Sequence, residues 1–548
     1  MKGCYWVGAL LAATLLAAPA WVQGAVVVSV TEHGAKGDGK TLDRTALNRA
    51  VEACAGAGGG QVRVPPGRYL TGTVRLRSGI TLMLDAGAVL VGTPDLEQYE
   101  SYAPPESRPG DRNHWHRALV LGVGVENVTI TGPGVIDGNK VRDPQGEEHM
   151  RGPHAVLFGD SRNVVLRDVR IHDAANYAVL LERTSHVEVR GVECTGGWDG
   201  VHFRGRKDQP CRDVRIIDCE FSTGDDCIAG GYWQDTLIDR CVINSSCNGI
   251  RLIGPARNLI VHDCLFYGPG RHEHRTSREK HRTNMLAGLC LQPGAWMATE
   301  GVLDDVKVSD VVMHDVTTPL HLSVKPGNTA GRVWVDRLTA TGVNLAAASL
   351  ESWAEAPIGR VCLRDVSLEF TGGGVVDPGR SEVRAPGVDA RPLPAWGLYA
   401  RNVQALQLEN VRLGVAKDDA RPAMIVEHVG TIDLDALKLP RGADPPVVLN
   451  DVREVRSSTM SITLVPAKCL DLSVTAMPLA AIATVEGGDQ EGLAQVELSV
   501  DAQTSAQWVW LKAHERKSVS FPKLSVSGTG THRIQCGDVA RDVPSGKD

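Results

Sequence analysis

The chain has 548 residues, 59 of them glycine, and only 5% of its residues are aromatic. This composition favours many short strands joined by tight corners over a helical bundle, and a solenoid can reach this length because it grows by adding repeats. The formal net charge is −7, so the composition gives no indication of nucleic-acid binding, and we expect no nucleic-acid partner.

Residues 1–24 have the features of a secretory signal peptide. Lys2 supplies a positive start, residues 7–18 form an apolar run, and small residues follow, with cleavage expected after Ala20 or Gly24. The run is too short to span a membrane, and no later segment is apolar enough to do so. We therefore expect an exported protein, periplasmic or extracellular, that has no membrane partner.

Residues 41–55 predict the one clear helix of the chain. Their apolar residues recur at helical spacing: Leu42, Ala46, Leu47, Ala50, Val51 and Cys54. Thr41 or Asp43 could cap its start and Gly56 its end. An amphipathic helix at this place would cover the first coil of a solenoid.

From residue 58 the pattern changes to short alternating runs, and residues 93–117 predict a long loop. A repeat of 22 to 27 residues is plainest between residues 163 and 264, where five short apolar strands follow one another: 163–168, 186–189, 213–216, 236–239 and 258–261. No helix-length segment separates these strands, and no two-residue hairpin joins them. The pattern predicts an all-β fold, in which residues 25–456 form a right-handed parallel β-helix with an N-terminal capping helix.

The last part of the chain, residues 457–548, lacks this period. Its alternating strands predict a small C-terminal β-sandwich, immunoglobulin-like, that serves as an accessory domain. Trp508 and Trp510 in this region are expected to pack rather than to bind glycan. Within the β-helix, residues 373–395 are rich in Gly, Pro, Arg and Asp and predict an inserted loop.

Four cysteines are expected at the same phase of successive repeats: Cys194, Cys219, Cys241 and Cys264. One interpretation is a disulfide framework, which export would permit. The favoured interpretation is a ladder of small buried thiols, because a large solenoid core needs no cross-links. The cysteine spacing does not fit a zinc site, and we expect no bound metal and no cofactor.

Three acids in this region predict a catalytic site. Asp199 lies in Gly-Trp-Asp-Gly, and Asp225 and Asp226 lie in Gly-Asp-Asp-Cys about one repeat later. Stacked repeats bring residues one repeat apart to within about 5 Å. Adjacent aspartates in a regular strand would send one carboxylate into the core, whereas Gly224 permits a bend that turns both outward. Hydrolysis of a glycoside needs an acid and a base, although aspartates also cap β-helix corners for purely structural reasons.

The chain resembles the polygalacturonases, glycoside hydrolase family 28, over about residues 30–455. Residues 34–39 and 58–70 resemble the entry segment of that family, residues 224–229 match its double-aspartate motif, and Asp199 with Gly200 matches the end of its Asn-Thr-Asp-Gly motif. The resemblance implies a β-helix of the pectin-lyase-like superfamily and hydrolysis with inversion. It also implies that Asp225 is the general acid and that Asp199 and Asp226 hold the attacking water.

The chain departs from the family at its other motifs. Gly197-Trp198 replace Asn-Thr, Asn248 stands where the family has a histidine, and residues 321–325, which end in Lys325, are the nearest match to the Arg-Ile-Lys motif. Those family residues bind the uronate substrate and support the acid. The differences therefore argue against polygalacturonate as the substrate more than they argue against hydrolysis.

Several side chains near the acids are candidates for binding the substrate. Trp198, Tyr232 and Trp233 could stack on sugar rings, and Arg251 could pair with a carboxylate or sulfate or be a solvated strand residue. The complete set of expected substrate-binding residues is Trp198, His202, Trp233, Asn248, Arg251 and Lys325. Residues 271–282 are rich in Arg, Lys and His and could hold an anionic glycan, although such a run is more often only solvated; a metal on His272, His274 and His281 is not expected.

The sequence thus predicts a monomeric glycoside hydrolase whose partner is a polysaccharide, pectic or otherwise acidic. Two alternatives stay open. One is a polysaccharide lyase or epimerase on the same fold, which would need a base beside an uronate C5 and often Ca²⁺. The other is a β-helix that binds glycan without catalysis.

Overall fold

The computed structural model describes residues 26–102, 116–275, 281–375, 383–440, 445–457, 462–476, 479–501, 503–524 and 530–544. The expected signal peptide, most of the expected loop at residues 93–117 and part of the loop at residues 373–395 lie outside the described residues. Among the described residues, no helix has the length and apolar character needed to cross a bilayer.

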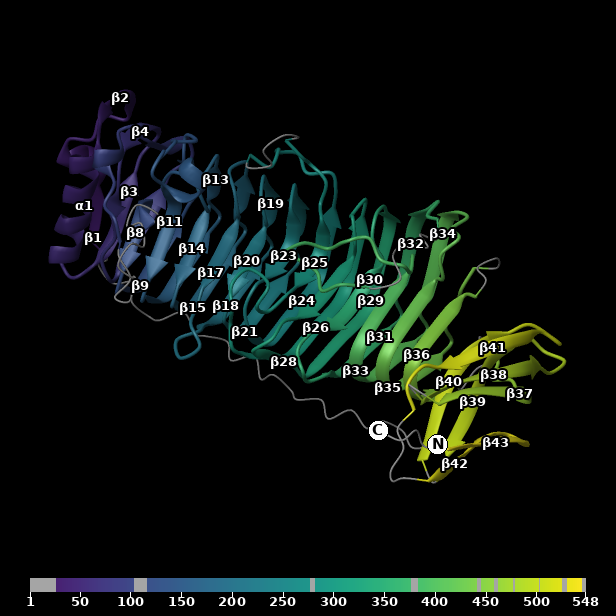
Figure 1. Cartoon of the computed structure of the whole chain (residues 1–548). Coiled ribbons are helices and arrows are strands. Elements are labelled where there is room, and N and C mark those ends of the chain that lie inside the picture. Colours follow the sequence, from purple (N-terminus) through teal and green to yellow (C-terminus); the bar gives the residue numbers. More distant parts are fainter. Residues whose placement is uncertain are drawn as a thin grey trace.

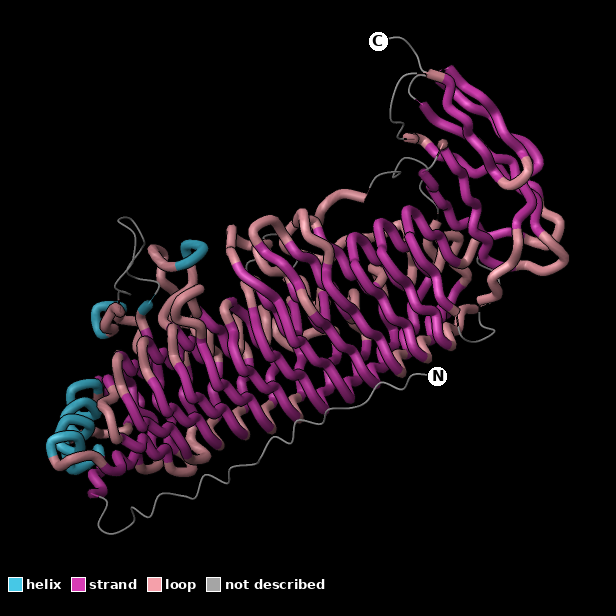
Figure 2. Tube along the Cα trace, turned by 90° about the horizontal axis from the view of Figure 1, so that it is seen from below, coloured by secondary structure: helices cyan, strands magenta, loops and turns pink. Residues whose placement is uncertain are grey.

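The described chain forms a long right-handed parallel β-helix, followed by a small β-sandwich (Figures 1 and 2). The predicted all-β fold is therefore confirmed. Each strand of the β-helix pairs in parallel with the strands one coil before and one coil after it, which gives three series of stacked strands. The five strands predicted from the repeat fall on β12 Arg162–Arg167, β15 Ser185–Arg190, β18 Cys211–Ile217, β21 Trp233–Asp239 and β24 Ala256–Tyr267.

The first series consists of β1 Val26–Ser29, β3 Gly60–Val64, β6 Ile80–Leu84, β9 Glu126–Thr131, β12 Arg162–Arg167, β15 Ser185–Arg190, β18 Cys211–Ile217 and β21 Trp233–Asp239. The second consists of β2 Asp38–Leu42, β4 Gly67–Thr71, β7 Ala88–Gly92, β10 Val135–Asp137, β13 Arg170–His172, β16 Glu193–Thr195, β19 Glu220–Thr223 and β22 Val242–Ser245. The third, which carries the site described below, consists of β5 Val74–Arg75, β8 Ala118–Val123, β11 His154–Gly159, β14 Val179–Glu182, β17 Val201–Arg204, β20 Ile228–Gly231, β23 Asn248–Leu252, β25 Ala287–Leu291, β27 Leu320–Val324 and β30 Ala348–Ser352.

Later coils have longer strands, several of which continue from one series into the next. They are β24 Ala256–Tyr267, β26 Gly301–His314, β28 Asn328–Ala330, β29 Arg332–Val343, β31 Ile358–Arg364, β32 Ser367–Gly372, β33 Leu398–Glu409, β34 Arg412–Lys417, β35 Met424–Asp435 and β36 Val447–Arg456. Alternating residues of each strand point inward, so that Val187, Val214 and Leu259, for example, stack in one buried core that runs along the β-helix.

The capping helix α1, Arg44–Gly56, closes the N-terminal end of this core with Leu47, Ala50, Val51 and Cys54 buried (Figure 1). It begins later than residue 41, because residues 38–42 form β2 and pair with β4. Asp43 occupies the capping position, but its carboxylate accepts hydrogen bonds from the backbone N–H groups of Lys36 and Gly37 at 2.7 and 3.0 Å. It therefore fixes the preceding turn instead of the first turn of the helix.

The cysteines form a buried ladder, with one correction. All twelve cysteines among the described residues are free, so the thiol interpretation is confirmed over disulfides. Cys219, Cys241 and Cys264 each follow the same corner of successive coils, and their thiols are adjacent. Cys194 is not in phase with them, because it pairs with Phe221 in the next coil. Cys219 therefore lies two residues before the position that stacks on Cys194.

The C-terminal region has two antiparallel sheets that share a second apolar core. One sheet consists of β37 Ala467–Ala476, β38 Leu479–Gly487 and β41 Arg516–Phe521; the other consists of β40 Gln503–Leu511, β39 Gly492–Val500, β42 Thr531–Cys536 and β43 Val539–Pro544. Trp508 and Trp510 pack against the end of the β-helix core, and the indole N–H of Trp508 donates to the carbonyl oxygen of Val452 at 3.0 Å. Both tryptophans therefore have the packing role expected of them.

Candidate active site

The three aspartates lie in the turns that lead from the second strand series to the third. Asp199 comes just before β17, and Asp225 and Asp226 come just before β20, one coil later. Because Val201 pairs with Ile228, Asp199 and Asp226 are in register on adjacent coils. Stacking of the repeats thus places them side by side, as the sequence predicted.

The turn before the acid pair is tight enough to require glycine. A Cβ atom at Gly224 would lie 2.6 Å from the carbonyl oxygen of Gly197 and 2.8 Å from that of Glu273. The backbone of the neighbouring coil and that of the loop after β24 therefore approach here without room for a side chain. Gly224 is needed for this close approach more than for the bend expected from the sequence.

The carboxylates converge. One oxygen from each of Asp199, Asp225 and Asp226 lies within 4.8 Å of the other two. Their side chains are less accessible than the sequence led us to expect, since the residues are only 4%, 8% and 6% exposed. Other side chains cover them.

Asp226 is fixed by the next coil. One of its oxygens, Oδ1, accepts hydrogen bonds from the backbone N–H and the side-chain amide of Asn248, at 2.9 and 2.8 Å. The other oxygen, Oδ2, makes no such bond and faces Arg251 at 3.9 Å. Asn248 therefore positions Asp226 and leaves one of its oxygens for chemistry.

Asp199 is held by a histidine of its own coil. Its Oδ2 lies 2.7 Å from Nδ1 of His202, whose ring stacks on Tyr177 with ring centroids 4.1 Å apart and planes only 5° from parallel. Burial, with the charge of Arg204 nearby, lowers the pKa of His202 well below its usual value. His202 is thus a neutral partner that orients Asp199.

Asp225 is covered by an arginine and a histidine from loops. Arg151 donates from Nη2 to Oδ2 of Asp225 at 2.9 Å, and Nε2 of His274 lies 3.4 Å from Oδ1. The guanidinium of Arg151 also lies 4.0 Å from the ring centre of Trp198 and 3.0 Å from Glu148. Arg151 belongs to the segment between β10 and β11, so this loop forms a cover over the acids.

These surroundings give the three acids different proton affinities. Burial raises the pKa of Asp199 well above its usual range, and the charges of Asp225 and Asp226 raise it further. Burial also raises the pKa of Asp226, although Arg251 opposes the effect. Burial alone would raise the pKa of Asp225, but the hydrogen bond to His274 and the charge of Arg151 outweigh it and lower that pKa far below its usual value. In this arrangement, Asp199 holds a proton more readily than Asp225 does.

Comparison with known proteins gives matches of the same kind at the levels of family, sequence and structure. Residues 27–271, somewhat less than half of the chain, match the sequence family described as rhamnogalacturonase A/epimerase, pectate lyase-like. A probable polygalacturonase of Vitis vinifera is 28% identical over 212 residues, and an exo-poly-alpha-D-galacturonosidase of Dickeya chrysanthemi is 28% identical over 265 residues. The matches cover 37% and 38% of this chain and 43% of each relative, so the chain spans less than half the length of these curated relatives.

Among solved structures, an exopolygalacturonase of Thermotoga maritima is 21% identical, with coverage of 71% of this chain and 92% of that chain and a TM-score of 0.49. The family match and the sequence relatives confirm the resemblance to the polygalacturonases.

Of the aromatic residues expected to bind sugar in this polygalacturonase-like site, Trp233 was wrongly assigned. It begins β21 in the first strand series, is 1% exposed, and stacks on Phe203 in the core with ring centroids 4.4 Å apart. Trp198 does lie beside the acids, but Arg151 and Arg275 cover its ring, so it is buried. Tyr232, between β20 and β21, is half-buried.

Arg251 and Lys325 are occupied by the loop that follows β32. Arg251 donates from Nη2 to the carbonyl oxygen of Val388 at 2.5 Å and pairs with Asp389 at 3.4 Å, while Nζ of Lys325 donates to the carbonyl oxygen of Pro386. The described part of this loop, residues 383–395, thus covers the third series beyond the acids. Neither cation is free to bind a substrate as expected while the loop stays in place.

Three residues near the acids were missed in the sequence. Arg151 and Glu147 lie in a loop with no repeat pattern, and Glu147 accepts a hydrogen bond from the hydroxyl of Tyr177 at 3.3 Å. Trp296 is 57% exposed, and the guanidinium of Arg251 lies 5.4 Å from its ring centre. It is a sugar-stacking candidate that only its position in the fold reveals.

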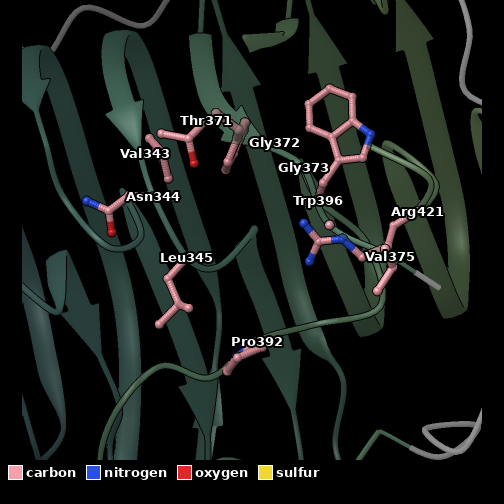
Figure 3. Close-up of a pocket in the computed structure, with 12 residues that line it drawn as sticks. Val343, Asn344, Leu345, Thr371, Gly372, Gly373, Val375, Pro392, Trp396 and Arg421 are labelled. Carbon is pink, nitrogen blue, oxygen red and sulfur yellow. The ribbon is translucent and has the colours of Figure 1, made fainter. Parts of the chain in front are cut away.

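A cavity of about 250 Å³ lies away from the acids, where residues 343–345, residues 370–375, Trp396 and Arg421 meet (Figure 3). None of its lining residues carries a carboxylate, so it lacks the acid and base that hydrolysis requires. The three aspartates stay the best-supported candidate for chemistry.

Proposed function

We propose that this chain is an exported glycoside hydrolase that cleaves glycosidic bonds in a pectic or other acidic polysaccharide. The observation that carries the proposal is the meeting of three carboxylates from adjacent coils, each with an oxygen within 4.8 Å of the others. Such a group supplies both a proton donor and a base on one surface, which is what hydrolysis of a glycoside needs.

In the proposed reaction, one carboxyl group gives its proton to the oxygen of the leaving sugar as the glycosidic bond breaks. A carboxylate accepts a proton from water, and the water oxygen forms the new bond to the anomeric carbon. We assign proton donation to Asp225 and the holding of the water to Asp199 and Asp226. The assignment rests on the match to the double-aspartate motif.

The charges around Asp225 and Asp199 add a condition to this assignment. Asp225 faces Arg151 and His274 and stays ionised, whereas Asp199 carries the raised pKa. Asp225 can act as an acid only once the ion pair with Arg151 is broken. We propose that a sugar ring stacking on Trp198 displaces Arg151 and that the proton then passes from Asp199 to Asp225 within the cluster.

An acidic substrate is supported by two observations. The relatives from Vitis vinifera and Dickeya chrysanthemi are named as polygalacturonan-cleaving enzymes. Arg151 and Arg275 both lie over Trp198, at 4.0 and 5.5 Å from its ring centre, so a sugar that displaces Arg151 from this ring would bring its carboxylate near two guanidinium groups.

The test is a panel of pectic and algal glycans assayed for the release of reducing ends. An unsaturated product that absorbs in the ultraviolet would instead indicate a lyase, and binding without release would indicate a non-catalytic glycan-binding protein. With a substrate in hand, proton NMR of the first product gives the stereochemistry, for which we propose inversion. The nearest oxygens are closer than the roughly 6.5–9.5 Å of most inverting sites, so a retained anomer would overturn that assignment.

The roles of Asp225 and Asp199 can be distinguished by changing the leaving group of the substrate. On an aryl glycoside with an acidic phenol, no proton donor is needed, so Asp225→Asn should lose far less activity on this substrate than on the polysaccharide. Asp199→Asn should lose similar activity on both. The reverse pattern would assign the acid to Asp199.

Export and the monomeric state are proposals of the same kind. N-terminal sequencing of protein recovered outside the cytoplasm should start after Ala20 or Gly24. Light scattering on that protein should give the mass of one chain.

A further inference from the structure

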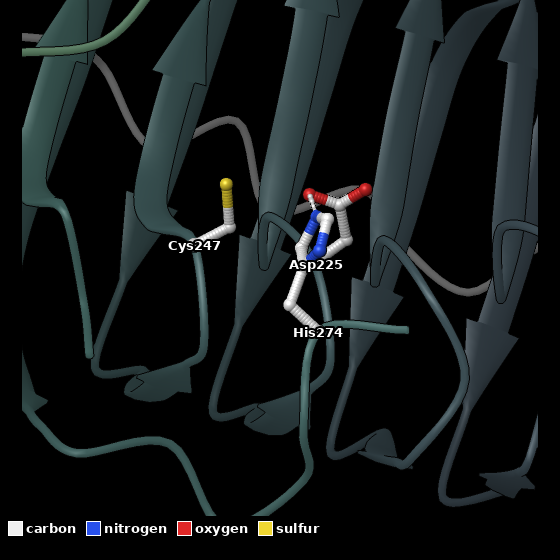
Figure 4. Close-up of side chains that lie close together, drawn as sticks. All are labelled: Asp225, Cys247 and His274. Atoms are coloured by element: carbon white, nitrogen blue, oxygen red, sulfur yellow. Dashed lines mark ion pairs between the residues drawn. The ribbon is translucent and has the colours of Figure 1, made fainter. Parts of the chain in front are cut away.

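A second group of side chains shares Asp225 with the acid trio. One potential ligand atom from each of Asp225, Cys247 and His274 lies within 4.8 Å of the other two, and all three residues are buried (Figure 4). Asp225 and Cys247 occupy equivalent positions in the turns before β20 and β23, and His274 comes from the loop after β24. A carboxylate, a thiol and an imidazole therefore converge from three segments.

The mixed donor set narrows the choice of cation. Ca²⁺ and Mg²⁺ prefer oxygen ligands, whereas sulfur, nitrogen and oxygen together favour Zn²⁺ and similar divalent ions. Two zinc ligands at about 2.1 Å in a tetrahedral arrangement lie about 3.4 Å apart. Nε2 of His274 and Oδ1 of Asp225 are 3.4 Å apart.

The surroundings are those of a supported ligand set. Arg151 binds Oδ2 of Asp225 and leaves Oδ1 toward His274. Arg282 donates from Nη2 to Sγ of Cys247 at 3.1 Å, the kind of outer contact that orients a metal-bound sulfur. The side-chain amide of the adjacent Asn248 also donates from Nδ2 to Sγ of Cys247 at 3.4 Å.

We propose that Asp225, Cys247 and His274 form a binding site for Zn²⁺ or a similar divalent transition-metal ion, with water as a fourth ligand. Cys247 loses its thiol proton to solvent on binding, and its Sγ moves by about 1 Å to complete the tetrahedron. No metal is expected from the sequence alone, because the histidines at 272–281 have no partnered carboxylate pattern. The ligands come together only through the stacking of the coils.

Metal binding at this site would compete with hydrolysis. A cation on Oδ1 of Asp225 prevents that carboxyl from carrying a proton, so Zn²⁺ should inhibit the enzyme. This consequence, unlike the binding itself, rests on the proposed function.

The test uses Co²⁺ as a spectroscopic probe of the full-length protein. A cobalt–thiolate bond gives an intense near-ultraviolet absorption band, which is independent of catalytic activity. We expect one Co²⁺ per chain, with the band lost when Zn²⁺ displaces it. Cys247→Ser should abolish the band, and His274→Gln should weaken Zn²⁺ binding at least tenfold, since it removes one ligand.

Cys290→Ser is the matched control. Cys290 is another buried thiol, on β25 in the coil after Cys247, and its Sγ donates to the side-chain oxygen of Gln292 instead. This variant should keep the band and the affinity. His274→Gln removes a loop side chain, so it gives an answer even where Cys247→Ser fails to fold.

Two results would overturn the site. One is the absence of a thiolate band in the unmodified protein, and the other is a band that survives Cys247→Ser, which would place the ion on other thiols such as the ladder at Cys219, Cys241 and Cys264. If Zn²⁺ binds as expected but no glycan is hydrolysed, the metal site stands and the proposed function fails. If hydrolysis is found without a cobalt band, the proposed function stands and the metal site fails.

Discussion

Two neighbouring regions of the third strand series both carry charged side chains, but these side chains have different kinds of partner. Around β17 and β20, the acids Asp199, Asp225 and Asp226 are covered by Arg151 and His274, which reach them from loops. Around β23 to β30, the charged side chains form hydrogen bonds and ion pairs with the loop that follows β32. The difference separates groups that a substrate can compete for from groups that hold the fold together.

In the second region, Glu351 shows what a structural acid looks like here. It is fully buried, and its two oxygens accept hydrogen bonds from Arg391 at 2.9 and 2.8 Å and from the indole of Trp353 at 2.8 Å. These bonds from Arg391 outweigh burial and lower the pKa of Glu351. Glu351 therefore has a partner for its charge, whereas the three aspartates lie close together and compete for protons. Carboxylates that shift one another's pKa values in this way are typical of catalytic sites.

The largest effect should come from Asp225→Asn. Loss of the proposed acid should lower kcat about 10²–10⁴-fold, with the fold unchanged by near-ultraviolet circular dichroism. The matched control is Asp263→Asn, at an exposed corner with φ 49°, a conformation that asparagine tolerates as well as aspartate does. A variant at position 225 that still turns over the substrate at the normal rate would remove Asp225 from the mechanism.

Glu351→Gln should give the opposite result: a loss of stability without a loss of turnover. Breaking a buried, bidentate ion pair leaves Arg391 without its charge partner and should cost about 3 kcal/mol of unfolding free energy. The pKa of Glu351 is lowered, so its contribution is present above the unfolded-state pKa and is lost as the pH falls toward the folded-state pKa. The difference between wild type and variant in chemical denaturation should thus shrink in acid. An unchanged stability together with a large fall in kcat would merge the two regions into one site.

The sequence predicted the parts of this comparison that follow the repeat. The strands and the convergence of Asp199 with Asp225 and Asp226 depend on which residues stack, and a period of 22 to 27 residues determines that. The capping helix follows separately, from the helical spacing of its apolar residues. Trp233 was misassigned because closeness in sequence to the acids does not place a residue in the same strand series. Alternation then turned its side chain into the core.

The side chains and loops that cover the acids and Arg251 could not be predicted, because they lie outside the repeating strands. Arg151 lies 74 residues before Asp225, and the contact of Arg251 with Val388 joins residues 137 positions apart. Neither segment repeats, so no pattern in the sequence links it to the coil it touches. The electrostatics of the trio depend on these contacts, and for that reason the ionised state of Asp225 also emerged only from the structure.

Arg151→Met should have a smaller effect than the loss of an acid. Methionine keeps much of the side-chain bulk over Trp198 and removes the charge, so the pKa of Asp225 should rise. If Asp225 is the proton donor, the alkaline limb of the pH–activity profile should move up by about one pH unit. Arg170→Met, at an exposed arginine of β13, is the control and should leave the profile in place. A limb that stays fixed, or moves down, would show that Arg151 does not set the protonation of the acid.

The smallest effect is expected from Asp389→Ala, which loosens the loop over the second region. Arg251 would lose its ion pair at 3.4 Å, keep its hydrogen bond to the carbonyl oxygen of Val388 and become more available to a substrate carboxylate. A partly exposed ion pair is worth up to about 1 kcal/mol, so KM for an acidic glycan should fall about two- to fivefold while kcat stays the same. Asp418→Ala, at an exposed acid in the loop after β34, is the control. A fall in kcat instead of KM would mean that residues 383–391 support the reacting groups, and the division between the two regions would then have to be drawn beyond β23.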